Sequence, residues 1–189
     1  GEVHTNLAIQ NSDLILAFGM RFDDRVTGTL KTYAPRAKKI HIEIDPSEIH
    51  KNVFVAVPLV GDLKTVITDL VPLVDEYDHK KKKKEINGWK AEADARSIMN
   101  WAEDGKLYVA HLIADIWMAT GGGAIVTTDV GQHQMWTAQY YQLDKPNRWL
   151  TSGGAGTMGF GLPSAIGAWF ADKDQEVWAV AGDGGFQMT

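Results

Sequence analysis

The chain has 189 residues, enough for one large domain or for parts of two. Its 19 Lys and Arg against 24 Asp and Glu give a net charge of −5, which excludes a broad positive field for nucleic acid. The absence of cysteine excludes disulfides, thiolate zinc sites and a cysteine nucleophile, and it fits a reducing compartment such as the cytoplasm. No apolar run approaches the roughly 18 to 20 residues of a membrane-spanning helix, and no signal peptide opens the chain. Because the sequence does not open on Met, we expect a piece of a longer protein.

Residues 1–78 predict alternating strands and helices. Short runs rich in β-branched residues at 14–18, 39–44 and 57–60 are typical of buried parallel strands. Asp62 is placed to cap a helix from Leu63 to about Tyr77, in which apolar residues recur at the spacing of one buried face. We assign these residues to one domain.

Residues 79–104 predict a charged linker or an exposed helix between two domains. The segment opens close to a run of lysines at 80–84, and like charges at this density repel one another and stay in solvent. Composition also changes here, because all seven Trp lie from Trp89 onward.

Residues 105–189 repeat the alternation of the first part. We expect helices at 107–120, 135–141 and 162–170, and strands at 124–128, 149–152 and 177–181. The fold class is therefore α/β, with parallel sheets flanked by helices in both parts.

Ligands of open α/β sheets bind beyond the carboxyl ends of strands, and two such places in residues 1–78 carry charge. The first predicted strand leads into Arg21-Phe22-Asp23-Asp24-Arg25, which is either a ligand site or a surface cluster of salt bridges. The second ends in Glu43-Ile44, where an acid can bond a ribose or an adenine.

Three further candidates lie in residues 105–189. Gln132 and His133 follow a strand, at the start of a helix, where side-chain and backbone donors can hold anionic oxygens. Gly154-x-Gly156-x-x-Gly159 matches the dinucleotide-binding pattern, although a run this rich in glycine satisfies it easily. Asp183, within Gly182-Asp183-Gly184-Gly185, suits a Mg²⁺–diphosphate better than a ribose, since Mg²⁺ takes carboxylate and phosphate oxygens.

Taken together and in this order, these segments resemble the large catalytic subunit of the acetolactate synthase family, which depends on thiamine diphosphate. The stretches at 19–28, 130–139 and 149–168 carry the resemblance, with Gly182-Asp183-Gly184 as the start of the wider superfamily's cofactor motif. It implies decarboxylation of pyruvate and transfer of the two-carbon unit to a second 2-oxoacid, in branched-chain amino-acid synthesis. Residues 1–78 would be the later part of a middle, FAD-binding domain, and residues 105–189 the front of a thiamine-diphosphate domain.

The resemblance also implies roles for single residues. Asp183 would bind Mg²⁺, FAD would lie against the first domain, and thiamine diphosphate against the second. No catalytic residue is expected in this segment, because the family's catalytic glutamate belongs to an N-terminal domain, so the segment alone should be inactive. The implied thiamine-diphosphate residues are Gln132, His133, Gly156, Met158, Gly184 and Gly185, and the implied FAD residues are Asp24, Arg25, Glu43 and Ile44.

The implied partners are pyruvate and 2-oxobutyrate, further copies of the subunit in a dimer or tetramer, and a small regulatory subunit. Neither nucleic acid nor a membrane is expected as a partner. Two other functions stay open: another thiamine-diphosphate enzyme of the pyruvate oxidase or carboligase type, and a non-catalytic nucleotide-binding module built on Gly154-x-Gly156-x-x-Gly159.

Overall fold

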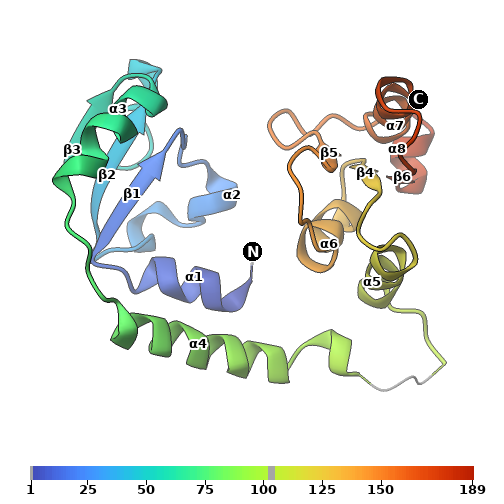
Figure 1. The fold of residues 1–189 in the computed structure, drawn as a ribbon, viewed down its shortest axis with the longest axis horizontal. Helices are drawn as coiled ribbons and strands as arrows, with labels where there is room; N and C mark the ends of the chain where they lie inside the picture. Colours follow the sequence, from blue (N-terminus) through green and yellow to red (C-terminus); the bar gives the residue numbers. More distant parts are fainter. Residues whose placement is uncertain (1, 102–104) are drawn as a thin grey trace. The chain divides into compact units, whose positions relative to one another are not determined.

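A computed structural model describes residues 2–101 and 105–189, which form two compact units, 1–95 and 96–189. The boundary falls inside the predicted linker, of which residues 102–104 lie outside the described part. Each unit is an α/β structure with a parallel three-stranded sheet (Figure 1), and this confirms the predicted fold class.

The first unit is built on a sheet in the order β1-β2-β3, formed by β1 (Leu14–Phe18), β2 (Lys38–Glu43) and β3 (Val57–Val60). All three strands agree with the predicted ranges to within one residue. The central strand β2 pairs Ile40 with Leu16 on one side and with Val57 on the other. Its side chains His41 and Ile42 are buried, as expected for a middle strand.

The connection after β1 forms the core of the first unit. Phe22 is buried although its φ of 50° is rare for a residue with a side chain, and its ring meets Tyr33 and His41 edge to face. The Asp23 carboxylate then accepts the backbone N–H groups of Arg25 and Val26 and so caps α2 (Asp24–Thr27). The remaining connections hold short 3₁₀ turns, η1 (Leu30–Thr32) and η2 (Pro46–Glu48).

Helix α3 (Leu63–Leu70) begins as predicted, with the Asp62 carboxylate accepting the N–H of Thr65, but it is shorter than predicted. The expected continuation to Tyr77 is wrong. Pro72 has no N–H for a helical hydrogen bond, so the chain passes through a 3₁₀ turn, η3 (Val71–Leu73), and leaves the helix.

Two helices of the first unit pack against each other. The sequence analysis did not predict α1 (Val3–Gln10), and α4 (Lys80–Ala95) runs along it (Figure 1). Four of the five lysines that open α4 stay exposed. Lys82 is half-buried, as are Ile86, Trp89 and Ala93, which form an apolar stripe on the helix. The charged segment is therefore a helix packed by a narrow apolar face.

The second unit is built on a sheet in the order β5-β4-β6, formed by β4 (Ile125–Thr128), β5 (Trp149–Thr151) and β6 (Val177–Val180). All four residues of β4 are buried, because helices cover both faces of the sheet (Figure 1). Ile113, Val126 and Tyr141 form its hydrophobic core.

The helices of this unit are α5 (Val109–Ala119), α6 (Gln132–Tyr140), α7 (Gly161–Ala171) and α8 (Asp183–Phe186), preceded by a 3₁₀ turn, η4 (Ile98–Asn100). Helix α6 begins three residues earlier than predicted, directly after the β4 connection, and α8 was not predicted. Within the described part of the chain, no helix has the length and apolar character needed to cross a membrane.

Candidate functional site

Three segments of the second unit meet at one edge of its sheet. Strands β4 and β6 are parallel, so the connections that follow them, from Asp129 and from Ala181, leave the same edge. The Asp129 N–H donates to the Val180 carbonyl at 3.0 Å and joins the two connections. The glycine-rich loop between β5 and α7 reaches the same place.

His133 links the β4 connection to the turn after β6. A Cβ built on Gly182 would lie 3.2 Å from His133 Cε1, and one on Gly131 only 2.9 Å from it, so glycine at both positions makes room for the ring. His133 Nε2 is buried and has no hydrogen-bond partner. A buried imidazole nitrogen without a partner is costly, and an oxygen of a bound ligand would relieve that cost.

Met158 links the glycine-rich loop to the same turn. Gly156 and Gly159 have φ of +64° and +87°, values that glycine adopts without strain, and they shape the loop around Met158. The Met158 methyl carbon Cε would lie 3.3 Å from a Cβ on Gly184. Met158 is 40% exposed, so its side chain remains free to contact a ligand above the turn.

Asp183 and Gln132 are exposed and hold few protein contacts. Asp183 Oδ1 accepts the N–H of Gly184 at 2.9 Å, which leaves its other oxygen for a cation. Gln132 opens α6, whereas its neighbour Gln134 is tied to β5 by a bond of 2.7 Å to Thr151 Oγ1. In the described residues, no group of three or more His, Asp or Glu side chains forms a metal site, so a cation at Asp183 would need ligands of another kind.

In the first unit, Asp24 and Arg25 line a groove of about 510 Å³ between α1 and α2. Neither residue forms an ion pair with another described residue. The ion pair of this segment is instead made by Arg21 Nε and Asp23 Oδ2, 2.8 Å apart. The four charged residues of this segment thus divide into a structural pair, Arg21 and Asp23, and a pair that faces the groove, Asp24 and Arg25.

Glu43 and Ile44 do not line that groove in the described structure. Glu43 Oε1 accepts the N–H groups of Ile44 and Asp45, so this oxygen closes the turn after β2. Its other oxygen, Oε2, lies 3.9 Å from His41 Nε2. A role for Glu43 in binding a ligand therefore stays a prediction.

Two residues near these sites were not singled out from the sequence. Asp129 is fully buried at the meeting point, and its only sequence signal was its place directly after a buried strand. Leu7 of α1 lines the groove, but the sequence of α1 has almost no amphipathic pattern, so no sequence signal indicated this helix.

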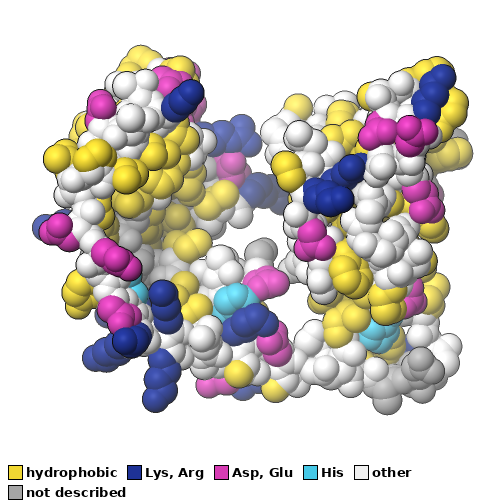
Figure 2. Space-filling view, viewed as in Figure 1, with side chains coloured by type: hydrophobic (Ala, Val, Ile, Leu, Met, Phe, Trp, Pro, Cys, Tyr) yellow, Lys and Arg dark blue, Asp and Glu magenta, His cyan; other side chains and the backbone are white. Residues whose placement is uncertain are grey.

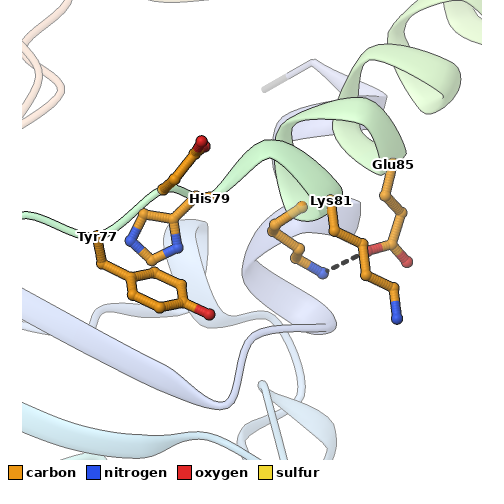
Figure 3. Close-up of a pocket in the computed structure, with 6 residues that line it drawn as sticks. Tyr77, His79, Lys81 and Glu85 are labelled. Carbon is orange, nitrogen blue, oxygen red and sulfur yellow. Dashed lines mark hydrogen bonds and ion pairs between the residues drawn. The ribbon is translucent and has the colours of Figure 1, made fainter.

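Another hollow of the described structure lies at the surface. The hollow of about 280 Å³ at the start of α4 is lined by exposed side chains (Figure 3). There the Tyr77 and His79 rings meet edge to face, with centroids 5.0 Å apart, and Lys82 pairs with Glu85 at 2.9 Å. These contacts satisfy the charged groups locally, and we assign no ligand to the hollow.

Two family descriptions match the chain, one in each unit. Residues 1–70 match the central domain of thiamine pyrophosphate enzymes, and residues 129–189 match their C-terminal, thiamine-pyrophosphate-binding domain. Thiamine pyrophosphate is another name for thiamine diphosphate. The second match covers the glycine-rich loop and Gly182–Gly185, and so it argues against a separate dinucleotide-binding module.

Curated relatives match the chain along its whole length. It is 45% identical to "Acetolactate synthase" of Mycobacterium leprae, 42% to "Acetolactate synthase isozyme 3 large subunit" of Escherichia coli and 44% to "Acetolactate synthase 2, chloroplastic" of Nicotiana tabacum. Each match covers 100% of this chain and 31%, 34% and 29% of the respective relative. The chain thus spans about a third of the length of these proteins. By both comparisons it belongs to the thiamine pyrophosphate enzymes and is a homologue of acetolactate synthase.

Proposed function

We propose that this chain forms the diphosphate-binding side of an acetolactate synthase active site. The reaction is the decarboxylation of pyruvate and the transfer of its two-carbon unit to pyruvate or 2-oxobutyrate, in branched-chain amino-acid synthesis. The observation that carries the proposal is the meeting of His133 with Gly182 and of Met158 with Gly184, with the buried His133 Nε2 left without a partner.

The residues at this meeting point suit thiamine diphosphate. His133 Nε2, if protonated, and the Gln132 amide would donate to diphosphate oxygens, while Gly184 and Gly185 allow the close approach of a phosphate to the backbone. Asp183 would hold Mg²⁺ with diphosphate oxygens as further ligands. Met158 would support the cofactor from below. The Gly156 carbonyl would accept a hydrogen bond from the aminopyrimidine of the cofactor. When bound, the cofactor supplies the electron sink for decarboxylation, and the protein supplies position and electrostatics.

The groove of the first unit suits FAD as a structural cofactor. The Arg25 guanidinium offers donors to an anionic group, and the Asp24 carboxylate accepts from hydroxyl or ring N–H groups. The apolar wall is provided by α1, through side chains such as Val3 and Leu7. Glu43 and Ile44 would contact the other end of the molecule, as the resemblance implies.

Further partners follow from the relatives. The Escherichia coli relative is named a large subunit, and we infer that the protein containing this chain assembles with further copies of itself and with a smaller regulatory subunit. We place the enzyme in the cytoplasm, since a chain without cysteine suits a reducing compartment.

The test measures acetolactate formation from pyruvate by the complete enzyme that contains this chain, as a function of thiamine diphosphate and Mg²⁺. His133→Ala removes a donor to the diphosphate and should raise the KM for thiamine diphosphate roughly tenfold or more. The matched control is His111→Ala, because His111 lies on α5, where its ring meets Tyr108 away from the three segments.

A second variant in the same assay, Asp183→Asn, removes one of the anionic groups available to Mg²⁺. Activity should then depend steeply on added Mg²⁺ and thiamine diphosphate. An enzyme that forms no acetolactate, or that ignores thiamine diphosphate, would contradict the proposed function. An Asp183→Asn enzyme with unchanged dependence on both would show that Asp183 only shapes its turn.

A further inference from the structure

Asp129 is a buried carboxylate in the middle of the proposed cofactor site. It is fully buried and is the first residue after β4, the central strand of the sheet. Among the described residues, no Lys, Arg or His side chain forms an ion pair with it. A buried carboxylate without a cation is stable only when hydrogen bonds replace its hydration, so its backbone partners are essential to it.

The partners of Asp129 come from the segments that form the site. Oδ1 accepts the N–H of Val130 at 2.7 Å, and both oxygens accept the N–H of Gly159 at 3.1 Å, across thirty positions of sequence. A Cβ on Gly185 would lie 2.5 Å from the carboxyl carbon, so the carboxylate packs directly on that glycine. One side chain thus touches both the glycine-rich loop and the turn after β6.

We infer that Asp129 is a positioning residue, which holds the glycine-rich loop in its binding shape before thiamine diphosphate arrives. This inference rests on the proposed function. Gly159 follows Met158 directly, so a bond that fixes the Gly159 amide also fixes the backbone that presents Met158 to the cofactor. Hydrogen bonds to an ionised acceptor are stronger than neutral ones, and a loop ordered in advance costs less to bind.

The test compares three variants of the complete enzyme. Asp129→Ala removes the acceptor and should raise the KM for thiamine diphosphate roughly ten- to hundredfold, while kcat recovers at saturating cofactor. Asp129→Asn keeps one oxygen that can accept from both Val130 and Gly159, and its KM should stay within about threefold of the wild type.

The control is Thr128→Val, which has nearly the same volume. Thr128 is also buried and is the last residue of β4, but its hydroxyl bonds Thr151 Oγ1 at 2.7 Å and accepts from Trp149 Nε1 at 3.3 Å, so these partners lie on β5. Its loss should lower the melting temperature without changing the KM for thiamine diphosphate. If Asp129→Ala behaves like this control, with lower stability and an unchanged KM, the inference is wrong.

If Asp129→Ala does not fold, hydrogen exchange on the wild-type enzyme tests the inference instead. Without cofactor, the Gly159 amide should exchange far more slowly than that of the exposed Gly154 in the same loop. Equal exchange at both amides would overturn the inference, since the loop would then be unordered until the cofactor binds. A wild-type enzyme without thiamine-diphosphate-dependent activity would instead contradict the proposed function, so the two failures are distinguishable.

Discussion

Neighbouring charged residues after β1 have different tasks, although the sequence presents them as one cluster. Arg21 and Asp23 pair with each other, and Asp23 caps α2, whereas Asp24 and Arg25 face the groove beside α1. The alternative of a surface salt-bridge cluster therefore describes the first pair, and the proposed ligand site belongs to the second. The fold separates them because a helix start needs an acceptor at its cap.

Arg25 provides a test of the flavin proposal. With Arg25→Ala, the complete enzyme should purify with little or no FAD, because its main donor to an anionic group is gone. Flavin absorbance per protein, followed by FAD titration, measures the effect. Arg36→Ala is the matched control, since Arg36 bonds the Asn11 side chain at 3.1 Å and does not line the groove. Flavin bound at wild-type affinity by the Arg25 variant would reject the assignment.

Because Asp23 has a lowered pKa and caps α2, we expect the stability of the α2 start to depend on pH. The Arg21 guanidinium, hydrogen-bonded to the Asp23 carboxylate, holds the pKa of that carboxyl below its ordinary 3.8, and the N–H groups of Val26 and Arg25 act in the same direction. A lowered pKa in the folded state stabilises the α2 start above pH 3.8, and this contribution is lost as the pH falls through the lowered pKa.

An NMR titration of the Asp23 carboxyl carbon checks this assignment. Arg21→Ala should move the pKa of Asp23 up toward 3.8, whereas Arg36→Ala should leave it in place. A pKa of Asp23 that is the same in wild type and Arg21→Ala would show that the ion pair has no effect in solution.

At the scale of elements, one of the glycines that follow α5 packs against Trp117, a residue next to the hydrophobic core. Gly121 and Gly122 have φ of +58° and +69°, and the Gly122 N–H donates to the Trp117 carbonyl at 3.0 Å. A Cβ on Gly122 would lie 2.7 Å from Trp117 Nε1, whereas one on Gly121 would meet nothing within 4 Å.

The two glycines therefore make a matched pair of variants. Alanine at either position costs about 1–2 kcal/mol for the left-handed backbone, but only Gly122→Ala must also displace the Trp117 indole. We expect the Gly122 variant to be the less stable of the two, as measured by the free energy of unfolding. Equal losses would mean that Trp117 moves aside without cost.

At the scale of the molecule, the first unit exposes apolar side chains of its edge strand. Leu14, Leu16 and Phe18 of β1 are 49%, 45% and 42% exposed, and hydrophobic side chains are visible on the surface of this unit (Figure 2). An open edge with apolar side chains favours association.

Residues 1–189 by themselves should therefore self-associate, bind a hydrophobic dye and form no acetolactate. Inactivity follows because Asp183 is the only side chain proposed for the metal, and the resemblance places the catalytic glutamate in another domain. The assay uses purified chain with excess thiamine diphosphate, Mg²⁺ and FAD. Turnover within ~100-fold of a typical ~10 s⁻¹ would contradict this expectation, and so would a monomeric chain that binds no dye.

Local patterns of the sequence determined the strands, the start of α3 and the family. Short apolar runs predicted the strands at 14–18 and 57–60 to the residue, and Asp62 marked the start of α3. The burial expected of these two strands is wrong, because both are outer strands of the sheet and most of their residues are exposed. Glycine-rich turns after strands are equally local, and they indicated the segments around His133 and Gly182 before their contacts were known.

Only the tertiary structure decided which side chains meet. The stripe of α4 becomes apparent only against α1, because Ile86, Trp89 and Ala93 are too few to predict burial without a partner helix. Asp129 looked like any polar residue after a strand. Its task depends on the Gly159 amide, thirty positions away, and such a contact depends on how β4, β5 and β6 pair rather than on any local pattern. Burial then turns an ordinary carboxylate into one that must be hydrogen-bonded, since an unpaired charge is costly away from water.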